Sequence, residues 1–208
     1  MTAEYQPDVQ IAATPASSIT LQSEQNLSQT GQVFRKILRE RKSCREFIQR
    51  DLSLATLSQL LWSACGINRP DNQHRTAPSA KNWQEIEVYV AMHSGLYLFD
   101  PHASVLRLVA EGDIRADTGW QDFVAKVPVN LIYVANLNKM DAAPIDEKKF
   151  YAALDTGFIS QNVYLFCAAE GLATVVRGWV DRPALAKTMK LGPDQRIIVA
   201  QSVGYAQT

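Results

Sequence analysis

The feature that most constrains the fold is the segment from Glu147 to Glu170, the longest stretch of helical periodicity in the sequence. Its apolar residues fall on almost every side of a helix instead of forming one stripe, and Gly171 stands where such a helix would end. A helix that is apolar nearly all round has to be buried on several sides. We therefore expect this segment to lie inside a layered structure, as helices at a subunit interface do.

Shorter elements precede and follow this helix. Apolar spacing predicts a helix from Gln32 to Arg41. Ser53 is suited to be the N-cap of a second helix that ends at Cys65, with Gly66 as its stop. Short β-branched or alternating runs predict strands at Glu85–Met92, Gly95–Phe99, Val105–Val109, Val129–Ala135, Ala173–Val180 and Arg196–Val203. A helix from Arg182 to Lys190, with Pro183 in its first turn, separates the last two strands.

The order of these elements favours an α+β fold. The first three strands follow one another closely and are expected to be antiparallel, and the uniformly apolar run Val129–Ala135 is expected to be central. The sequence has neither internal repeats nor a βαβ series with a glycine-rich dinucleotide loop, so a Rossmann fold is disfavoured. We expect a central sheet with helices packed against it.

Composition excludes several classes of protein. The 208 residues include 21 basic and 21 acidic ones, and this balance gives no field that would gather nucleic acid or anionic lipid. No apolar run approaches the roughly 20 residues that cross a bilayer. The three cysteines and three histidines have no spacing typical of a disulfide framework, a metal site or a hydrolase triad. We expect no metal and a reducing, cytoplasmic location.

The first thirty residues differ from the rest of the chain. Residues 1–30 are rich in Ser, Thr, Gln and Ala, and they lack the basic start and apolar core of a signal peptide. We expect an extended or disordered N-terminal arm over 1–30, followed by a single domain over 31–208.

Three separated segments carry the signals for a bound ligand. Arg41, Lys42, Ser43 and Arg45 gather cations and a hydroxyl in five residues, which are the donors that a phosphate needs, although cations at a helix end are often only solvated. The turn Arg75–Asn82 contains Pro78, Ser79, Ala80 and Asn82, and such residues often form nothing more than a connection. Val176, Arg177 and Gly178 end a strand, where glycine permits close approach of a ligand or of another backbone.

In this order the segments resemble the FMN-dependent nitroreductase family, and more closely its branch of SagB-type dehydrogenases. The family pattern Arg-Arg-Ser-x-Arg stands here as Arg41–Arg45, with lysine at its second position. The pattern Pro-Ser-Ala-Gly-Asn stands here as Pro78–Asn82, with Lys81 in place of glycine. The resemblance runs from about Gly31 to Tyr205, and its further matches are Gly95–Pro101, Ala153–Gly171 and Val203–Tyr205. It implies a mixed, mostly antiparallel sheet between two helical layers and an interlocked homodimer.

The resemblance also implies roles for the three segments. Arg41 and Arg45 would clamp the phosphate of FMN, with Lys42 assisting and Ser43 donating to the phosphate or the ribityl chain. Pro78, Ser79, Ala80 and Asn82 would reach the flavin of the partner subunit. The main chain of Val176, Arg177 and Gly178 would face flavin N5, and the Arg177 side chain could also meet the cofactor or an anionic substrate. We name no catalytic side chain, because the flavin carries the chemistry.

The activity that the resemblance implies is hydride transfer from NAD(P)H through flavin N5 to a nitroaromatic, quinone or similar acceptor, with ping-pong kinetics. Trp120 and Phe123 would form a lid over the flavin or else belong to the core. Two alternatives stay open. One is a SagB-type azoline dehydrogenase that acts on modified peptides. The other is a flavin-binding protein without meaningful turnover, suggested by Lys81 and by the few residues that follow Tyr205 in this sequence.

Overall fold

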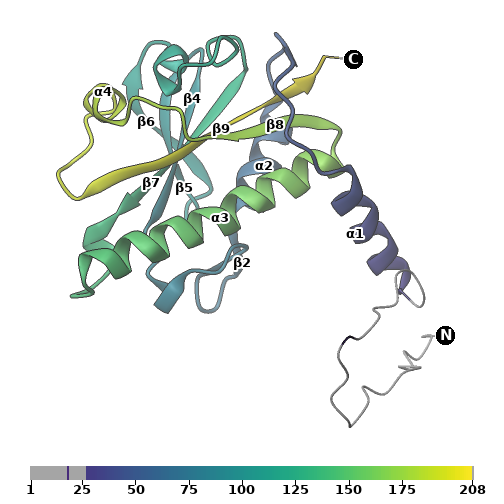
Figure 1. Ribbon diagram of the computed structural model, residues 1–208, viewed down its shortest axis with the longest axis horizontal. Coiled ribbons are helices and arrows are strands. Elements are labelled where there is room, and N and C mark those ends of the chain that lie inside the picture. The colour runs from purple at the N-terminus through teal and green to yellow at the C-terminus, as the bar shows by residue number, and fades with distance from the viewer. Residues whose placement is uncertain (1–17, 19–26, 208) are drawn as a thin grey trace. The chain divides into compact units, whose positions relative to one another are not determined.

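A computed structural model describes residue 18 and residues 27–207 (Figure 1). The chain divides into two compact units, residues 1–39 and residues 40–208. In the first unit, helix α1 (Gln29–Glu40) confirms the helix expected from Gln32 and begins three residues earlier. Most of the expected arm over 1–30 lies outside the described residues. The cationic segment follows directly after α1, as predicted.

The second unit is built around a seven-stranded sheet in the order β1-β9-β7-β4-β5-β6, with β8 paired to β9. Every strand pair in the described part of the chain is antiparallel, so the sheet is less mixed than the resemblance implied. The strands are β1 (Phe47–Ile48), β4 (Ile86–Met92), β5 (Gly95–Asp100), β6 (Val105–Glu111), β7 (Val129–Asn136), β8 (Leu172–Arg177) and β9 (Gln195–Ala206). A separate hairpin joins β2 (Ile67–Arg69) to β3 (His74–Arg75).

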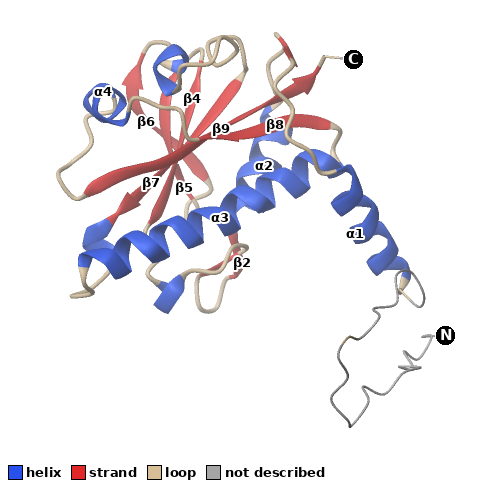
Figure 2. Cartoon of the chain, in the orientation of Figure 1, coloured by secondary structure: helices blue, strands red, loops and turns tan. Residues whose placement is uncertain are grey.

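Helices cover both faces of the sheet, which confirms the expected α+β layers (Figure 2). On one face, α2 (Leu54–Cys65) and α3 (Ile145–Ala169) bury their apolar residues against β4 and β7. On the other face, α4 (Arg182–Thr188) packs Leu185 and the following Met189 against β4, β7 and β9. The connections that the structure describes contain three short 3-10 helices, η1 (Ala80–Asn82), η2 (Arg115–Thr118) and η3 (Leu137–Lys139).

Local signals explain where the helices begin and end. The Ser53 hydroxyl accepts the backbone N–H of Thr56 at 3.0 Å, and Gly66 N–H donates to Trp62 O at 2.8 Å, so both predicted ends of α2 are confirmed. Asp181 caps α4, and Pro183 occupies its first turn as expected. Together these caps fix how the chain enters and leaves the two helical layers.

The long helix α3 carries apolar residues on several sides, as the sequence predicted. One side of it is buried against α2 and the sheet. Its other side still exposes large apolar side chains, with exposed fractions of 63% for Phe150, 41% for Leu154 and 39% for Phe158. Within the described residues no helix is both long enough and apolar enough to span a membrane.

Candidate functional site

The cationic segment lies along the outer edge of β8, the edge that does not pair with β9. The N–H of Cys44 donates to the carbonyl of Thr174 at 2.9 Å, and this contact fixes the loop beside the strand. Lys42, Ser43 and Arg45 are exposed, and Arg41 is partly buried with its guanidinium carbon 5.4 Å from the centre of the Tyr164 ring. The loop therefore presents its cations next to the end of β8.

Tyr164 of α3 joins the first segment to the third. Its hydroxyl lies 2.8 Å from Ser43 Oγ and accepts the backbone N–H of Val176 at 2.9 Å. Sequence reasoning did not single out Tyr164. No sequence signal pointed to it, because Ser43 stands 121 residues away. The structure thus brings Arg41–Arg45 and Val176–Gly178 together around one phenol.

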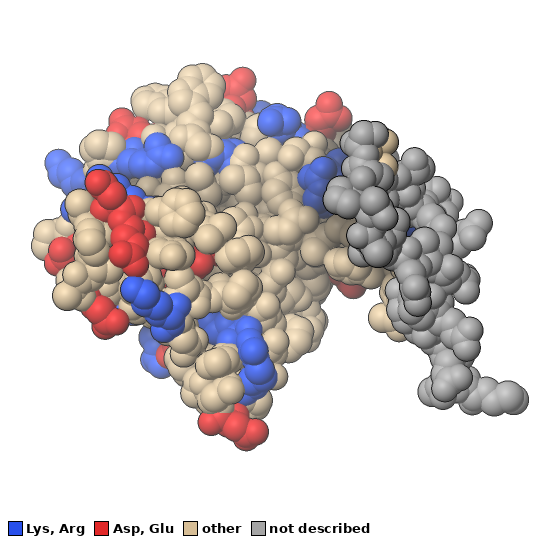
Figure 3. All heavy atoms as spheres, turned by 60° about the horizontal axis from the view of Figure 1, so that its bottom comes forward, with Lys and Arg blue, Asp and Glu red and all other residues tan. Residues whose placement is uncertain are grey.

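The cations of the first segment have no acidic partner within the described residues: no carboxylate there lies within ion-pair distance of Arg41, Lys42 or Arg45. Unpaired guanidinium and ammonium groups side by side repel one another, and an anion between them would relieve that repulsion. On the face drawn in Figure 3, by contrast, basic and acidic side chains are interspersed.

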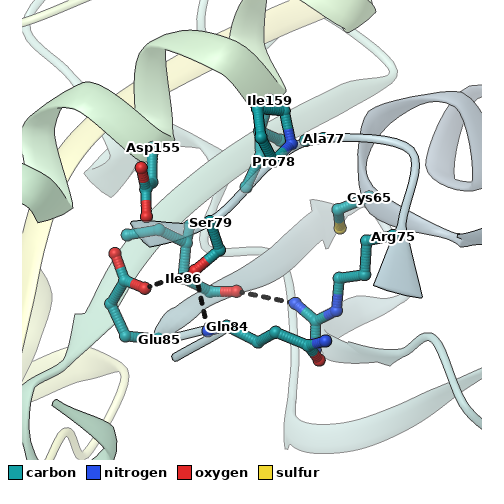
Figure 4. A pocket seen from close by; sticks show the side chains of 10 residues that line it. All are labelled: Cys65, Arg75, Ala77, Pro78, Ser79, Gln84, Glu85, Ile86, Asp155 and Ile159. Carbon is teal, nitrogen blue, oxygen red and sulfur yellow. Dashed lines mark hydrogen bonds between the residues drawn. The ribbon is translucent and has the colours of Figure 1, made fainter. Parts of the chain in front are cut away.

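The second segment, Pro78–Asn82, forms a tight turn that hydrogen bonds to neighbouring side chains stabilise (Figure 4). Ser79 Oγ accepts the N–H of Gln84 at 2.8 Å and donates to Glu85 Oε2 at 3.2 Å, while Ala80 N–H donates to Asp155 Oδ2 at 2.9 Å. Lys81 has a φ of 51°, in the left-handed region that glycine adopts most easily. This conformation accounts for glycine at that position in the family pattern.

Glu85 and Asp155 form a pair of buried carboxyl groups beneath the turn. Glu85 is 0% exposed and Asp155 is 2% exposed, and Glu85 Oε1 has no hydrogen-bond partner among the described residues. Burial raises the pKa of Glu85, and the nearby Asp155 charge raises this pKa further. Both effects favour the protonated form of the Glu85 carboxyl. Neither carboxyl was singled out from the sequence.

The first and second segments do not meet within one chain. The turn contacts α3 at Asp155 and the cationic segment contacts it at Tyr164, nine positions further along the helix. At a rise of about 1.5 Å per residue, these points are roughly 13 Å apart along the axis. The cavity bordered by Pro78, Ser79 and Asp155 has a volume of only about 10 Å³ and cannot take a flavin ring. One chain thus presents two separate parts of a site.

In the third segment, Val176–Gly178, the main chain and the Arg177 side chain have different surroundings. Gly178 is exposed, and a Cβ at its position would meet no atom within 4 Å. Arg177, by contrast, is 3% exposed, and its guanidinium donates to Ser202 Oγ, Asn130 Oδ1, Gln121 Oε1 and to both oxygens of Thr118. Desolvation lowers the pKa of Arg177 to about 10. Its side chain is engaged inside the protein, so a ligand would meet only its main chain.

A comparison with known proteins identifies the family. The sequence profile of the Nitroreductase family matches residues 38–205. The chain belongs to the nitroreductase family. A candidate nitroreductase of Methanocaldococcus jannaschii is 30% identical over 152 residues, which cover 68% of this chain and 76% of the relative. The crystal structure of a candidate nitroreductase from Ralstonia eutropha JMP134 is 39% identical, has a TM-score of 0.81, and aligns over 91% of this chain and 89% of its own.

More distant nitroreductase-fold structures share the architecture. The NADPH:FMN oxidoreductase of Vibrio harveyi, solved with NAD⁺, is 14% identical with a TM-score of 0.65 over 85% of this chain and 70% of its own. A chain of the E. coli microcin synthetase McbBCD complex is 22% identical with a TM-score of 0.74 over 97% of this chain and 85% of its own. Membership of the nitroreductase family makes the chain, in general terms, an oxidoreductase.

Two aromatic residues expected near the nitroreductase site have different surroundings. Phe123 is half-buried and packs against Phe47, which is also half-buried, with ring centres 5.4 Å apart. Trp120 is 59% exposed, and its N–H donates to the carbonyl of Trp179 at 3.3 Å. Trp179 is 66% exposed and directly follows Gly178. Trp120 is thus placed beside Trp179, where it could cover a ligand at the end of β8.

The described residues offer little support for a metal site or a reactive cysteine. No group of His, Cys, Asp and Glu that could hold a metal ion occurs in the part of the chain that the structure describes. Burial raises the pKa of the Cys65 thiol to about 11 and that of Cys167 to about 12, so neither forms a thiolate near neutral pH. Both thiols are free, and the cytoplasmic location stays a prediction.

Proposed function

We propose that this protein is a homodimeric, FMN-dependent oxidoreductase that takes hydride from NAD(P)H and passes electrons to a nitroaromatic, quinone or similar acceptor. The observation that carries the proposal is the position of the unpaired cations Arg41, Lys42 and Arg45. The Cys44–Thr174 hydrogen bond and the Tyr164 hydroxyl hold them at the same strand edge as the exposed Gly178.

The donor set of this chain fits FMN. Arg41 and Arg45 would bind the phosphate, because a guanidinium offers paired N–H groups that match phosphate oxygens. Lys42 would add a point charge, and Ser43 would donate to the phosphate or the ribityl chain. Val176 to Gly178 would face the flavin ring with their main chain, and Gly178 leaves space for it.

Bound FMN would supply hydride acceptance and donation at N5, so no side-chain acid or base is needed. The residues of the chain would bind and orient the ring. Trp120 and Trp179, both exposed beside the end of β8, would limit the access of water and favour flat acceptors.

A second copy of the chain would complete the site. The exposed face of α3 carries Phe150, Leu154 and Phe158 at four-residue spacing, so they form one stripe along the helix. Ala153 and Gly157 lie beside this stripe and are exposed too. Paired α3 helices would bury it and bring the Pro78–Asn82 turn of one copy to the cations of the other. This arrangement accounts for the separation of the two segments within one chain.

The test compares FMN with riboflavin, which lacks the phosphate. Purified protein should bind FMN, and its flavin absorbance should bleach when NADPH or NADH is added without oxygen. The double variant Arg41→Ala with Arg45→Ala should bind FMN at least tenfold more weakly and riboflavin almost unchanged, because only the phosphate contacts are lost. Arg50→Ala, a nearby exposed arginine that stacks on Tyr205, is the control. Equal losses for both flavins in the double variant would place the phosphate elsewhere.

The likeness to the McbBCD chain over 97% of this protein favours a second candidate, a SagB-type azoline dehydrogenase. That activity would oxidise azoline rings in modified peptides with FMN as the electron acceptor. Oxidation of an azoline-containing peptide by the FMN-loaded protein, together with slow turnover of NAD(P)H, would support it over the first proposal. A protein that binds FMN and stays oxidised with excess NADPH, NADH and azoline peptide would be a flavin carrier without turnover.

A further inference from the structure

A second cavity lies outside the proposed flavin site. It has a volume of about 200 Å³ and opens between the β2–β3 hairpin, β4, β5 and β6. The apolar residues that border it are the buried Ile86, Val88 and Phe99 and the partly exposed Leu98 and Pro101. None of the cationic residues 41–45 and none of residues 176–178 borders it. Arg75 lines both this cavity and the small one beside Pro78, and Figure 4 shows its guanidinium next to the carbonyl of Ile86.

The acidic side chains of this cavity are already neutralised. Asp100 accepts two hydrogen bonds from Arg107, at 2.6 and 3.0 Å, and the backbone N–H groups of His102 and Ala103 at 3.0 and 3.1 Å. A saturated carboxylate of this kind has little attraction left for a further cation.

Glu87 is held in the same way on the opposite wall. It pairs with Lys139 at 3.0 Å and accepts the side-chain amides of Asn136 at 3.0 Å and Gln195 at 2.8 Å. Each of the two acids in the lining therefore has its own cation, and neither is free to pair with Arg75.

Arg75 is the cation that remains. No carboxylate in the described part of the chain lies within ion-pair distance of it. Its Nε is buried without an acceptor, and its Nη1 reaches only the Ile86 carbonyl at a long 3.4 Å. The Arg75 guanidinium therefore has no ion-pair partner and one long hydrogen bond within the described residues, so an anion in the cavity would meet a positive charge that is not yet compensated. The arginine, lysine and carboxylate side chains of the lining together carry one uncompensated positive charge.

We propose that this cavity binds a small carboxylate with an apolar body, such as a single-ring aromatic acid. Arg75 would hold the carboxylate through its terminal guanidinium N–H groups, and the partly exposed Leu98 and Pro101 would contact the ring. A monoanion matches the single excess charge, whereas a phosphate dianion would leave one negative charge uncompensated. The volume is below the roughly 300 to 1,000 Å³ of sites for drug-sized ligands, so the ligand is small.

The walls of the cavity are fixed before any ligand binds. His102 Nδ1 lies 2.8 Å from Gln73 Oε1, which ties the loop after β5 to the turn of the β2–β3 hairpin. Arg69 Nη2 donates to the Arg75 carbonyl at 2.8 Å and holds the backbone of that residue in place. Binding would therefore need little rearrangement.

The experiment is a titration of the full-length, FMN-loaded protein with 4-fluorobenzoate, followed by fluorine NMR and by the flavin absorbance. We expect saturable binding of one molecule per chain with an unchanged flavin spectrum. Arg75→Gln should weaken this binding at least tenfold. Arg50→Gln, which removes the same charge at an exposed position that does not border the cavity, should leave it within twofold. The neutral analogue 4-fluorobenzamide should not bind.

Other outcomes overturn the proposal. Binding that shifts the flavin absorbance and is unchanged in Arg75→Gln would place the acid over the cofactor. Binding that is weakened equally by Arg75→Gln and Arg50→Gln would reflect only the net charge of the protein. Absence of binding in the parent protein at millimolar acid would exclude the site. Because FMN content is measured separately, each result is independent of the proposed oxidoreductase activity.

Discussion

The hydroxyl of Tyr164 lies 2.8 Å from the hydroxyl of Ser43, across a sequence separation of 121 residues. The same phenol accepts the N–H of Val176, so it connects the segment expected to bind a phosphate with the segment expected to face a flavin ring. One side chain of α3 therefore links the two ends of the proposed site, in addition to the Cys44–Thr174 backbone hydrogen bond.

Tyr164→Phe is expected to weaken FMN binding. The substitution removes an acceptor from Val176 N–H and a partner from Ser43 while keeping the ring beside Arg41. Losing hydrogen bonds of this kind costs about 1 kcal/mol, which corresponds to roughly a fivefold rise in Kd. The measurement is quenching of FMN fluorescence by the apo-protein. Tyr151→Phe on the same helix is the control, and equal affinity in both variants would show that the bridge does not position the site.

Glu85→Gln is expected to change how stability depends on pH. The folded-state pKa of Glu85 is raised, so the folded protein holds a proton that the unfolded chain releases above about pH 4.5. The parent protein should therefore lose stability as pH rises from about 4.5 toward the folded pKa, by up to about 1.4 kcal/mol per pH unit. The neutral amide has no such loss, so the variant should be the more stable protein near pH 7.

Urea unfolding of the apo-protein between pH 5 and 8, at one fixed protein concentration, measures this difference. Glu111→Gln, at an exposed position on β6, is the control and should follow the parent. Parallel pH curves for Glu85→Gln and the parent would mean that Glu85 is ionised in the folded protein.

Most of the fold could be predicted from local signals. The apolar spacing predicted helices α2, α3 and α4 and the six longer strands to within a few residues of their observed ends. The cap at Ser53, the stop at Gly66 and the first-turn Pro183 helped to place the ends of α2 and α4. The two-residue strand β1 and the hairpin of β2 and β3 could not be predicted, because two or three residues carry no hydrophobic period. Their pairing depends on contacts with distant parts of the chain.

The site could be predicted only in part, for the same reason. Its loops have distinctive compositions, such as the cations of Arg41–Arg45 and the turn at Pro78. Tyr164, Glu85 and Asp155 look like ordinary residues of a helix and a strand start, and the tertiary structure alone reveals their roles. Arg177 illustrates the opposite case, because its charge suggested a ligand while the fold buries it in a hydrogen-bond network.

Arg177→Met is expected to destabilise the protein strongly. The side chain donates to acceptors on β7, β9 and the loop around Thr118, and several of them would be left buried without a donor. At about 1–3 kcal/mol for each buried group left unpaired, a total loss of roughly 2–4 kcal/mol is reasonable after partial relaxation. Chemical denaturation measures it, with the exposed Arg196→Met as the control. A loss below about 1 kcal/mol would mean that water replaces the guanidinium.

Gly157→Arg is expected to convert the proposed dimer into a monomer. Within one chain a Cβ at Gly157 would meet no atom within 4 Å, and replacing a helical glycine stabilises a helix by up to about 1 kcal/mol. The folded chain should therefore tolerate the change. On the proposed interface, however, arginine would separate two closely packed α3 helices beside Phe158. Sedimentation should show a monomer, and FMN should be lost with it, because the Pro78–Asn82 turn of the second copy is no longer present.

Gly192→Arg provides the matched control for this last prediction. Gly192 is also exposed, and a Cβ there would make only an ordinary contact with Gln195, at 3.6 Å. It lies after α4, far along the chain from the apolar stripe of α3, so this variant should remain a dimer with FMN bound. If Gly157→Arg stayed dimeric and became more stable, the exposed stripe of α3 would not be the interface. If it became monomeric and still bound FMN, each chain would hold its flavin without the turn of a second copy.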